Sequence, residues 1–214
     1  MPDPKPFSIA VTGLGGQGIL LLAKSIANAA LSEFPYVCRT ESRGLSQRGG
    51  SVQSMVRFGY RPMTAIVEEG SADLVISLEF LEAARSISLL SEAGVLVGSA
   101  NFIPPAGLVD QWNLSKDAGA EMGFRQFLMN LMANQSGVFS IDALAIASSV
   151  QCSKASNVAV LGAASHFLPL SHENLKSALL LNLKNEYRLA NGLAFDAGRE
   201  SLRSSLDENR RISA

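Results

Sequence analysis

Four glycines between Gly13 and Gly18 constrain the fold of this chain more than any other feature of its sequence. They follow the apolar run FSIAVTG at residues 7–13, and they precede an amphipathic stretch at residues 19–32. The spacing G-x-G-x-x-G is typical of the tight turn between the first strand and the first helix of a dinucleotide-binding α/β unit. The segment therefore predicts a strand, a close turn and a helix in immediate succession.

The rest of the chain continues to alternate between strand-like and helix-like segments. Residues 51–59 alternate apolar and polar side chains, which is the period of a half-exposed strand. Strands separated by helices favour a mainly parallel sheet with helices on both faces. We therefore predict a single α/β domain over residues 1–203, with a three-layer α/β/α, Rossmann-like architecture, and a polar, frayed tail over 204–214. The predicted strands are residues 7–13, 36–40, 51–59, 71–79, 94–100 and 138–142, and the predicted helices are residues 19–32, 79–90, 116–135 and most of the chain after 143, interrupted at Pro169.

Length and composition exclude several classes of function. The 214 residues include 18 Lys and Arg against 19 Asp and Glu, with no basic cluster, so we expect no nucleic-acid binding. Gly, Ser or charged residues interrupt the apolar stretches well before the ~20 residues that a membrane-spanning helix needs. The N-terminal sequence MPDPKPF lacks the basic and apolar regions of a signal peptide. Together these features predict a globular, cytoplasmic protein without a membrane partner.

Cysteine and histidine content excludes the common cluster and zinc sites from this chain. Cys38 and Cys152 are its only cysteines, and they form no C-x-x-C motif. Iron–sulfur clusters are usually held by a full set of cysteine thiolates, and structural zinc by a full set of Cys and His ligands. We therefore predict two reduced cysteines, no bound metal, and structural or surface roles for His166 and His172.

The glycine turn is a candidate site because the start of the following helix would leave backbone N–H groups free to bind an anion. In such turns the glycines permit a tight bend, close approach of a ligand and close packing of the helix on the strand. Glu41, at the end of the second predicted strand, lies where a dinucleotide site needs its acidic residue. Gln17 adds an amide that could contact a ligand. The alternative is a glycine turn that binds nothing.

A second polar segment, RTESRGLSQRGG at residues 39–50, combines long charged side chains with glycines. Loops at the carboxyl ends of parallel strands form the binding crevice of an open α/β sheet, so we expect this loop to lie beside the glycine turn. Paired guanidinium groups beside a glutamate can bind a carboxylate or phosphate, or form ion pairs across a subunit interface. The alternative is a solvated surface loop. The candidate residues of the two segments are Gly13, Gly15, Gly16, Gln17, Gly18, Glu41, Arg43, Gln47, Arg48, Gly49 and Gly50.

Glu79 and Glu82 lie at a predicted strand end and helix start. Carboxylates at a helix start are stabilised by the helix dipole, so we expect mainly structural roles for both and for the nearby Asp73. The alternative for Glu79, which closes a strand near the predicted crevice, is contact with a ligand.

Several segments together carry a resemblance that covers nearly the whole chain. In order they are VTGLGGQGILLLAKSIANAA, ESRGLSQRGGSVQSMVRFG, ADLVISLEFLEAAR, KASNVAVLGAASHFLPL and NEYRLANGLAFDAGRE. They resemble the gamma-type subunit of 2-oxoacid:ferredoxin oxidoreductases, and in particular the small (beta) subunit of the indolepyruvate ferredoxin branch. The form SQRGGSV favours that branch. The branch usually has THG where this chain has Ser42, Arg43 and Gly44, which leaves the identity of the aryl or branched 2-oxoacid open.

The resemblance implies that this chain is one subunit of a heteromeric enzyme. Such an enzyme converts an aryl 2-oxoacid, coenzyme A (CoA) and oxidised ferredoxin to an acyl-CoA, carbon dioxide and reduced ferredoxin. Thiamine diphosphate with Mg, and 4Fe-4S clusters, would belong to a larger partner subunit, because this chain has few cysteines and no GDG-plus-Asn pattern for a magnesium diphosphate. This chain would then bind no cofactor, carry no catalytic residue of its own and be inactive alone. Its two glycine-containing segments would form a wall of the shared site for CoA and the 2-oxoacid, or an interface with the partner.

Two other functions are compatible with the residues alone. A free-standing NAD(P)- or flavin-binding oxidoreductase would use the glycine fingerprint itself, although no Tyr-x-x-x-Lys or similar hydride-transfer set is present. A scaffold protein would keep the fold without the enzyme complex. Binding of NAD(H) by the isolated chain would favour the first, whereas a neighbouring gene for a thiamine-dependent, cluster-binding chain would favour the oxidoreductase subunit.

Overall fold

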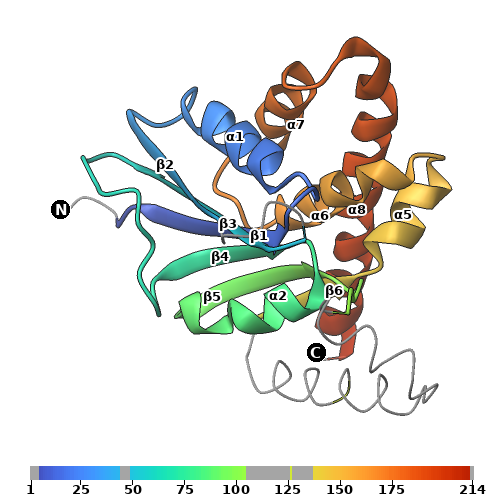
Figure 1. The fold of residues 1–214 in the computed structure, drawn as a ribbon, viewed down its shortest axis with the longest axis horizontal. Coiled ribbons are helices and arrows are strands. Elements are labelled where there is room, and N and C mark those ends of the chain that lie inside the picture. Colours follow the sequence, from blue (N-terminus) through green and yellow to red (C-terminus); the bar gives the residue numbers. More distant parts are fainter. Residues whose placement is uncertain (1–4, 44–48, 105–125, 127–136, 213–214) are drawn as a thin grey trace.

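The computed structural model describes residues 5–43, 49–104, 126 and 137–212. Within these residues a six-stranded sheet forms the centre of the molecule, in the order β2-β3-β1-β4-β5-β6 (Figure 1). The strands are β1 (Phe7–Leu14), β2 (Tyr36–Arg43), β3 (Ser51–Gly59), β4 (Ala72–Ser77), β5 (Leu90–Ser99) and β6 (Val138–Ile141). The helices are α1 (Ile19–Ala30), α2 (Phe80–Arg85), α5 (Ala143–Ser149), α6 (Ser156–Ala164), α7 (His172–Leu181) and α8 (Asn185–Ile212), with 3₁₀ turns η1 (Ile87–Leu89) and η2 (Ser153–Ala155).

The sheet is mainly parallel, as the alternation of strands and helices predicts. β1 pairs in parallel with β4, β4 with β5, and β5 with β6. β3 runs antiparallel to both of its neighbours, β1 and β2. Because β3 occupies the position beside β1, β2 is displaced to the end of the strand order.

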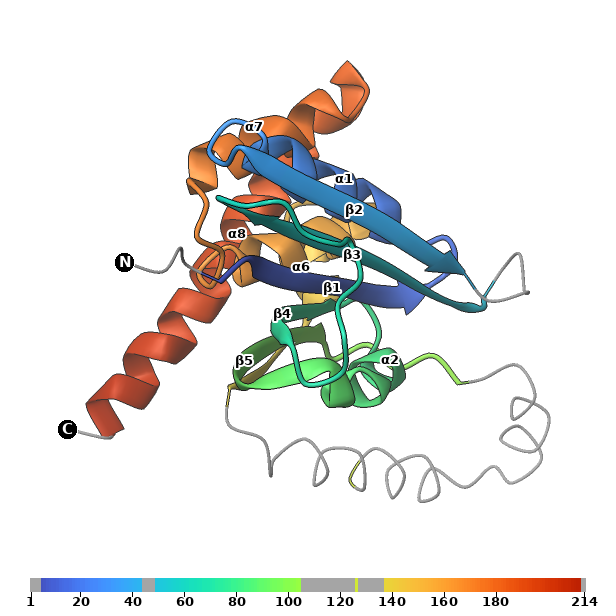
Figure 2. The ribbon, with the colours of Figure 1, turned by 90° about the vertical axis from the view of Figure 1, so that its left-hand side faces the viewer.

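Helices cover both faces of the sheet, which confirms the predicted three-layer α/β/α architecture. α1 and α6 pack on one face, with α7 against α1 and α8 against α6, while α2 packs on the opposite face against β1, β4 and β5 (Figure 2). Successive residues of a strand point to opposite faces, so each central strand supplies two cores. In β1, Ile9 and Val11 join the larger core and Ala10 joins the smaller core beneath α2.

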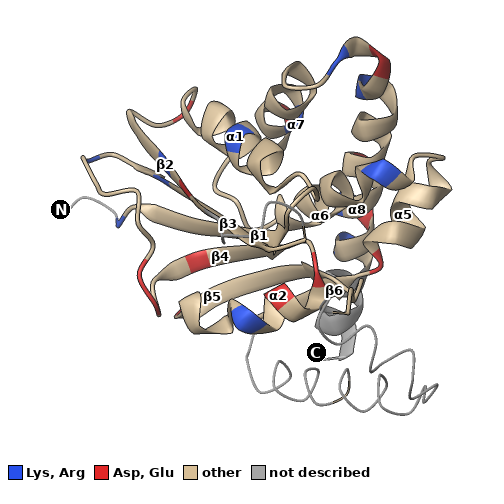
Figure 3. Cartoon of the chain, in the orientation of Figure 1, with Lys and Arg blue, Asp and Glu red and all other residues tan. Residues whose placement is uncertain are grey.

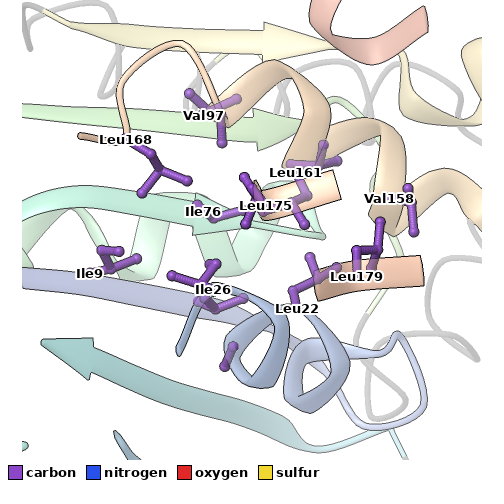
Figure 4. Close-up of a cluster of buried hydrophobic side chains, with 14 of the residues drawn as sticks. Ile9, Leu22, Ile26, Ile76, Val97, Val158, Leu161, Leu168, Leu175 and Leu179 are labelled. Atoms are coloured by element: carbon purple, nitrogen blue, oxygen red, sulfur yellow. The ribbon is translucent and has the colours of Figure 1, made fainter. Parts of the chain in front are cut away.

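The larger core joins the sheet to two layers of helices. Figure 4 shows Leu22 and Ile26 of α1 near Leu179 of α7, with Ile9 and Ile76 of the sheet in the same cluster. All of these side chains are buried. The contact holds α1, and with it the glycine turn at its start, firmly on the sheet.

α6 and α8 approach each other closely because each contributes a glycine to their contact. A Cβ atom on Gly162 would meet the carbonyl oxygen of Phe195, and one on Gly198 would meet the carbonyl oxygen of Ala159. Residues 158–164 of α6 are all buried, as expected for a helix enclosed within a domain. This packing fixes where the first residues of α6 lie relative to the strand ends.

Several predicted boundaries differ from the observed ones. β2 continues beyond the predicted end at Thr40 because β3 pairs with it as far as Arg43. Residues 79–90 hold the short helix α2 and a 3₁₀ turn rather than one continuous helix, and β5 begins at Leu90. α8 continues to Ile212, into the tail for which fraying stays a prediction. The predicted helix over 116–135 lies outside the described residues, apart from Gln126, which is helical.

Charged residues are spread over the described chain. Figure 3 shows Lys and Arg on several separate elements, interspersed with Asp and Glu. Among the described helices, none combines the length and the apolar composition required to cross a lipid bilayer.

Candidate functional site

The glycine turn joins the end of β1 to the start of α1 at the carboxyl edge of the parallel strands. Gly16 and Gly18 have φ angles of 99° and 87°, in the left-handed region that glycine enters without the steric cost of a Cβ. Gly18 is the N-cap of α1, and no described side chain caps this helix or places a carboxylate in its first turn. The positive end of the α1 dipole therefore remains available to an anion.

The side chain of Gln17 serves the turn itself. Its Oε1 accepts a hydrogen bond from the Leu14 N–H at 2.7 Å, and its Nε2 donates to the Leu78 carbonyl at 3.4 Å. A Cβ on Gly13 would lie 2.7 Å from the same Oε1, so glycine at position 13 leaves room for this side chain. The amide that the sequence offers as a ligand contact is thus already engaged in joining the ends of β1 and β4.

The structure brings the glycine turn beside the end of the second polar segment. The Gly15 N–H donates to the Gly50 carbonyl at 2.9 Å, and Leu14 pairs with Ser51 at the last position of the β1–β3 ladder. Gly49, beside them, has a φ of 69°. The predicted contact between the two segments is therefore confirmed at Gly15 and Gly50. Gln47 and Arg48 lie outside the described residues, and of Arg43 only the backbone, in β2, is described.

Glu41 does not occupy the position that a dinucleotide site requires. Such a site places its acidic residue at the end of the strand next to β1, but here β3 lies between β1 and β2. Glu41 is therefore two strand spacings, about 10 Å, from β1, and its carboxylate pairs with Arg39 at 2.9 Å. The prediction that Glu41 completes a dinucleotide fingerprint is wrong, because that fingerprint assumes that β1 and β2 are neighbours.

A pocket of about 390 Å³ opens beside the glycine turn, where the parallel strands end. Its described lining comes from the segments that follow β1, β4, β5 and β6 and from the start of α6, including Gly16, Asn101, Leu144, Lys154 and Asn157. Ligands of open α/β sheets bind at this edge because the loops after the parallel strands converge there. The pocket is therefore the candidate functional site.

The chemistry of the lining favours an anionic ligand. Lys154 supplies a positive charge, Asn101 and Asn157 supply amides, and none of the described lining side chains is acidic. α1 and α6 both begin at the pocket, since Gly16 precedes α1 and Asn157 lies in the first turn of α6. Helix starts attract negative charge through their free N–H groups and dipole.

Most of this lining was not identified from the sequence. Of the candidate residues whose side chains the structure describes, only Gly16 and Gln17 line the pocket. Lys154 and Asn157 belong to the KASN segment, which carries part of the resemblance but contains no local motif for a ligand. The fold brings this segment against the turn so closely that a Cβ on Gly18 would meet the side-chain amide of Asn157.

Two buried glutamates lie behind the pocket, at the start of α2. The Glu79 carboxylate accepts hydrogen bonds from the backbone N–H groups of Glu82 and Ile103, each at 2.9 Å. Burial raises the pKa of Glu79; hydrogen bonds from the backbone oppose the shift, and the charge of Glu82 adds to it. Glu82 accepts from the Ser51 hydroxyl and from the Arg85 guanidinium, each at 2.6 Å. The expected structural role at a helix start is confirmed for Glu79, which is the N-cap of α2 and whose side chain accepts from the Glu82 N–H.

The described residues do not fit an iron–sulfur cluster or a magnesium diphosphate. They contain no group of three or more His, Cys, Asp or Glu side chains that could hold a metal ion. Cys38, in β2, and Cys152, before η2, are both free thiols. What the described lining offers is the N–H groups at the helix starts and Lys154, which suit an anion.

Proteins of known identity match this chain over almost its full length. The sequence profile of the family described as pyruvate ferredoxin/flavodoxin oxidoreductase matches residues 8–201. The chain is 32% identical over 206 residues to indolepyruvate oxidoreductase subunit IorB of Pyrococcus horikoshii, covering 95% of this chain and 99% of that protein. It is 33% identical over 208 residues to the subunit of the same name from Thermococcus kodakarensis, covering 94% and 98%.

Solved structures share the fold at lower sequence identity. The gamma subunit of a keto/oxoacid ferredoxin oxidoreductase from Geobacter sulfurreducens aligns with a TM-score of 0.63 and 21% identity, covering 92% of this chain and 99% of that one. A 2-oxoglutarate:ferredoxin oxidoreductase from Magnetococcus marinus, with 2-oxoglutarate, CoA and succinyl-CoA bound, aligns with a TM-score of 0.69 and 19% identity, covering 94% of this chain but 32% of that longer chain. The resemblance inferred from the sequence is thus confirmed, and the chain belongs to the pyruvate ferredoxin/flavodoxin oxidoreductase family.

Proposed function

We propose that this chain is the small, non-cluster and non-thiamine subunit of a cytoplasmic, heteromeric 2-oxoacid:ferredoxin oxidoreductase of the indolepyruvate type. The complex would oxidatively decarboxylate an aryl 2-oxoacid, form its CoA thioester and transfer the electrons to ferredoxin. Family membership over residues 8–201 and the near full-length match to two IorB subunits support this proposal.

The pocket beside the glycine turn would bind CoA, and its charge is the observation that carries this part of the proposal. CoA bears phosphate groups, whereas the described lining contains Lys154 and no acidic side chain. The N–H groups at the starts of α1 and α6 would hydrogen-bond the phosphate oxygens. The amide of Asn101 and the NH₂ group of Asn157, whose Oδ1 already accepts from the Val158 N–H at 2.8 Å, would hydrogen-bond the neutral parts of the molecule. A volume of about 390 Å³ lies within the usual range of small-molecule sites.

The redox and carbanion chemistry would take place on the larger partner subunit. Thiamine diphosphate supplies the electron sink for decarboxylation when it is bound there with Mg, and 4Fe-4S clusters carry the electrons. The residues of this chain would instead bind CoA, orient it toward the shared site and exclude water at the subunit interface. The chain alone should therefore be inactive, and its contribution should appear as a dependence of the rate on CoA concentration.

Purification of the tagged chain from its native cells tests the proposed assembly. The expected result is a brown complex that contains a larger chain with thiamine diphosphate and that reduces ferredoxin when an arylpyruvate and CoA are added. A colourless chain that purifies alone would contradict the proposal. Titration of that isolated chain with NAD(H) and flavins, compared with a Gly16→Val variant, would then decide whether the turn holds a dinucleotide.

A further inference from the structure

We infer that Glu79 and Glu82 are positioning residues, which hold two walls of the pocket from behind through the first turn of α2. The inference rests on the proposed function, since it assigns to these residues the geometry of the CoA site. Neither side chain lines the pocket. Both are buried, with 0% and 2% of their surface exposed, so their effect on a ligand has to pass through the residues they contact.

Glu82 holds the wall formed by the glycine turn. Its Oε2 accepts a hydrogen bond from the Ser51 hydroxyl at 2.6 Å. Ser51 begins β3 and pairs with Leu14, the last residue of β1. The carbonyl of the preceding residue, Gly50, accepts the 2.9 Å hydrogen bond from Gly15. Gly16, the next residue of the turn, lines the pocket. The contact between Glu82 and Ser51 therefore fixes the start of β3, and the glycine turn is hydrogen-bonded to the residue just before it.

Glu79 holds the wall that follows β5. Its Oε1 accepts a hydrogen bond from the Ile103 N–H at 2.9 Å, and the N–H of Phe80, the first residue of α2, donates to the Asn101 carbonyl at 2.8 Å. Asn101 lines the pocket. The first turn of α2 therefore hydrogen-bonds the segment after β5 at two points, Asn101 and Ile103. The second oxygen of Glu79 accepts from the Glu82 N–H and caps the start of α2.

Capping alone does not account for a glutamate pair at this position. A Ser or Asp would satisfy one N–H at the start of a helix, but only a longer side chain also reaches Ile103 of another segment. Of the two buried carboxyl groups, Glu82 pairs with Arg85, whose side chain is 56% exposed, whereas Glu79 accepts backbone N–H groups. Buried charges of one sign cost stability unless every oxygen is well satisfied. Each carboxylate oxygen accepts a hydrogen bond, and the partners that the structure describes beyond α2, Ser51 and Ile103, belong to segments that border the pocket.

Hydrogen–deuterium exchange and CoA kinetics on the reconstituted complex test the inference. Ser51→Ala removes the hydroxyl that Glu82 holds while leaving the pair of Glu82 with Arg85, and Glu82→Ala removes the acceptor. Both variants should speed exchange in the peptide containing the Gly15 amide. Each should raise the KM for CoA by roughly fivefold, the effect of one lost hydrogen bond, with kcat at saturating CoA unchanged. The double variant should be no worse than the more severe single variant, because both remove the same interaction.

Asp196→Asn is the matched control, since it weakens the exposed pair with Lys176 on α7 and α8, away from the pocket. It should change neither Gly15 exchange nor the KM for CoA. Unchanged exchange in the Ser51→Ala variant, or faster exchange with an unchanged KM, would overturn the positioning role. A wild-type complex whose rate did not depend on CoA would contradict the proposed function instead, whatever the exchange shows.

Discussion

Replacing Gly18 with alanine tests whether the glycine turn and α6 form one binding site. Gly18 has a φ of 87°, and an alanine held in left-handed backbone costs about 1–2 kcal/mol. The new Cβ would also meet the side-chain amide of Asn157, whose Cγ would lie 3.5 Å away. Because that amide lines the pocket, its displacement should remove one hydrogen bond to CoA. We expect a KM for CoA about fivefold to tenfold higher, since a typical hydrogen bond contributes about 1 kcal/mol.

Gly70→Ala is the control for the backbone cost of this change. Gly70 has a φ of 69°, and a Cβ there would have nothing within 4 Å, so only the conformational cost applies. Urea unfolding should show a similar loss of about 1–2 kcal/mol from the backbone in both variants. CoA titrations of the reconstituted complex should show the change in KM for Gly18→Ala alone. An equal KM in the two variants would refute the assignment of Asn157 to the site.

Three further changes test the charge of the pocket and the polar groups behind it. Lys154→Met should raise the KM for CoA about threefold to tenfold at low salt, and less at high salt because salt screens the charge of the exposed Lys154 side chain. CoA titrations at two ionic strengths check this. An increase in KM that does not depend on salt would contradict it. Thr12→Val should raise the unfolding free energy by about 1 kcal/mol, because the buried Thr12 hydroxyl has no hydrogen-bond partner among the described residues. Thermal unfolding should show a higher midpoint than wild type, and a lower one would count against this. Because its pKa is raised, Glu79 holds its proton more tightly in the folded chain than in the unfolded chain. As pH rises from 4.5 through the raised pKa, the unfolding free energy of the wild type should therefore fall relative to that of Glu79→Gln. Urea titrations across that interval would refute this if the difference in unfolding free energy between the two proteins stayed constant.

The sequence predicts the glycine turn of this site because the backbone conformation of the turn is determined by residues that are neighbours in sequence. Gly16 and Gly18 need left-handed backbone between a strand and a helix, and that need can be read from the spacing alone. The two polar segments are also expected side by side because both come after strands of the same direction, although the hydrogen bond between Gly15 and Gly50 that joins them extends the β1–β3 ladder. These features depend on turn chemistry and strand polarity, which short segments determine.

The remaining parts of the site depend on strand order, which short segments do not determine. The alternation of residues 51–59 predicts a strand but not its insertion, antiparallel, between β1 and β2. That insertion moves Glu41 away from the glycine turn. In the same way, Asn157 reaches the pocket because Gly162 and Gly198 let α6 and α8 pack closely, a contact between segments far apart in sequence.

The placement of the carboxylates explains how the proposed CoA site would combine a cationic lining with walls held by buried acidic groups. An acidic side chain in the pocket would repel the phosphates of CoA, yet the walls need strong hydrogen-bond acceptors to hold their backbone N–H groups and hydroxyls. Glu79 and Glu82 meet that need from the opposite side of the sheet edge, where Arg85 and the start of α2 offset their charge. The negative charge therefore supports the pocket without entering it. A lining with Lys154 as its charged side chain can then bind an anion while the buried pair maintains its shape.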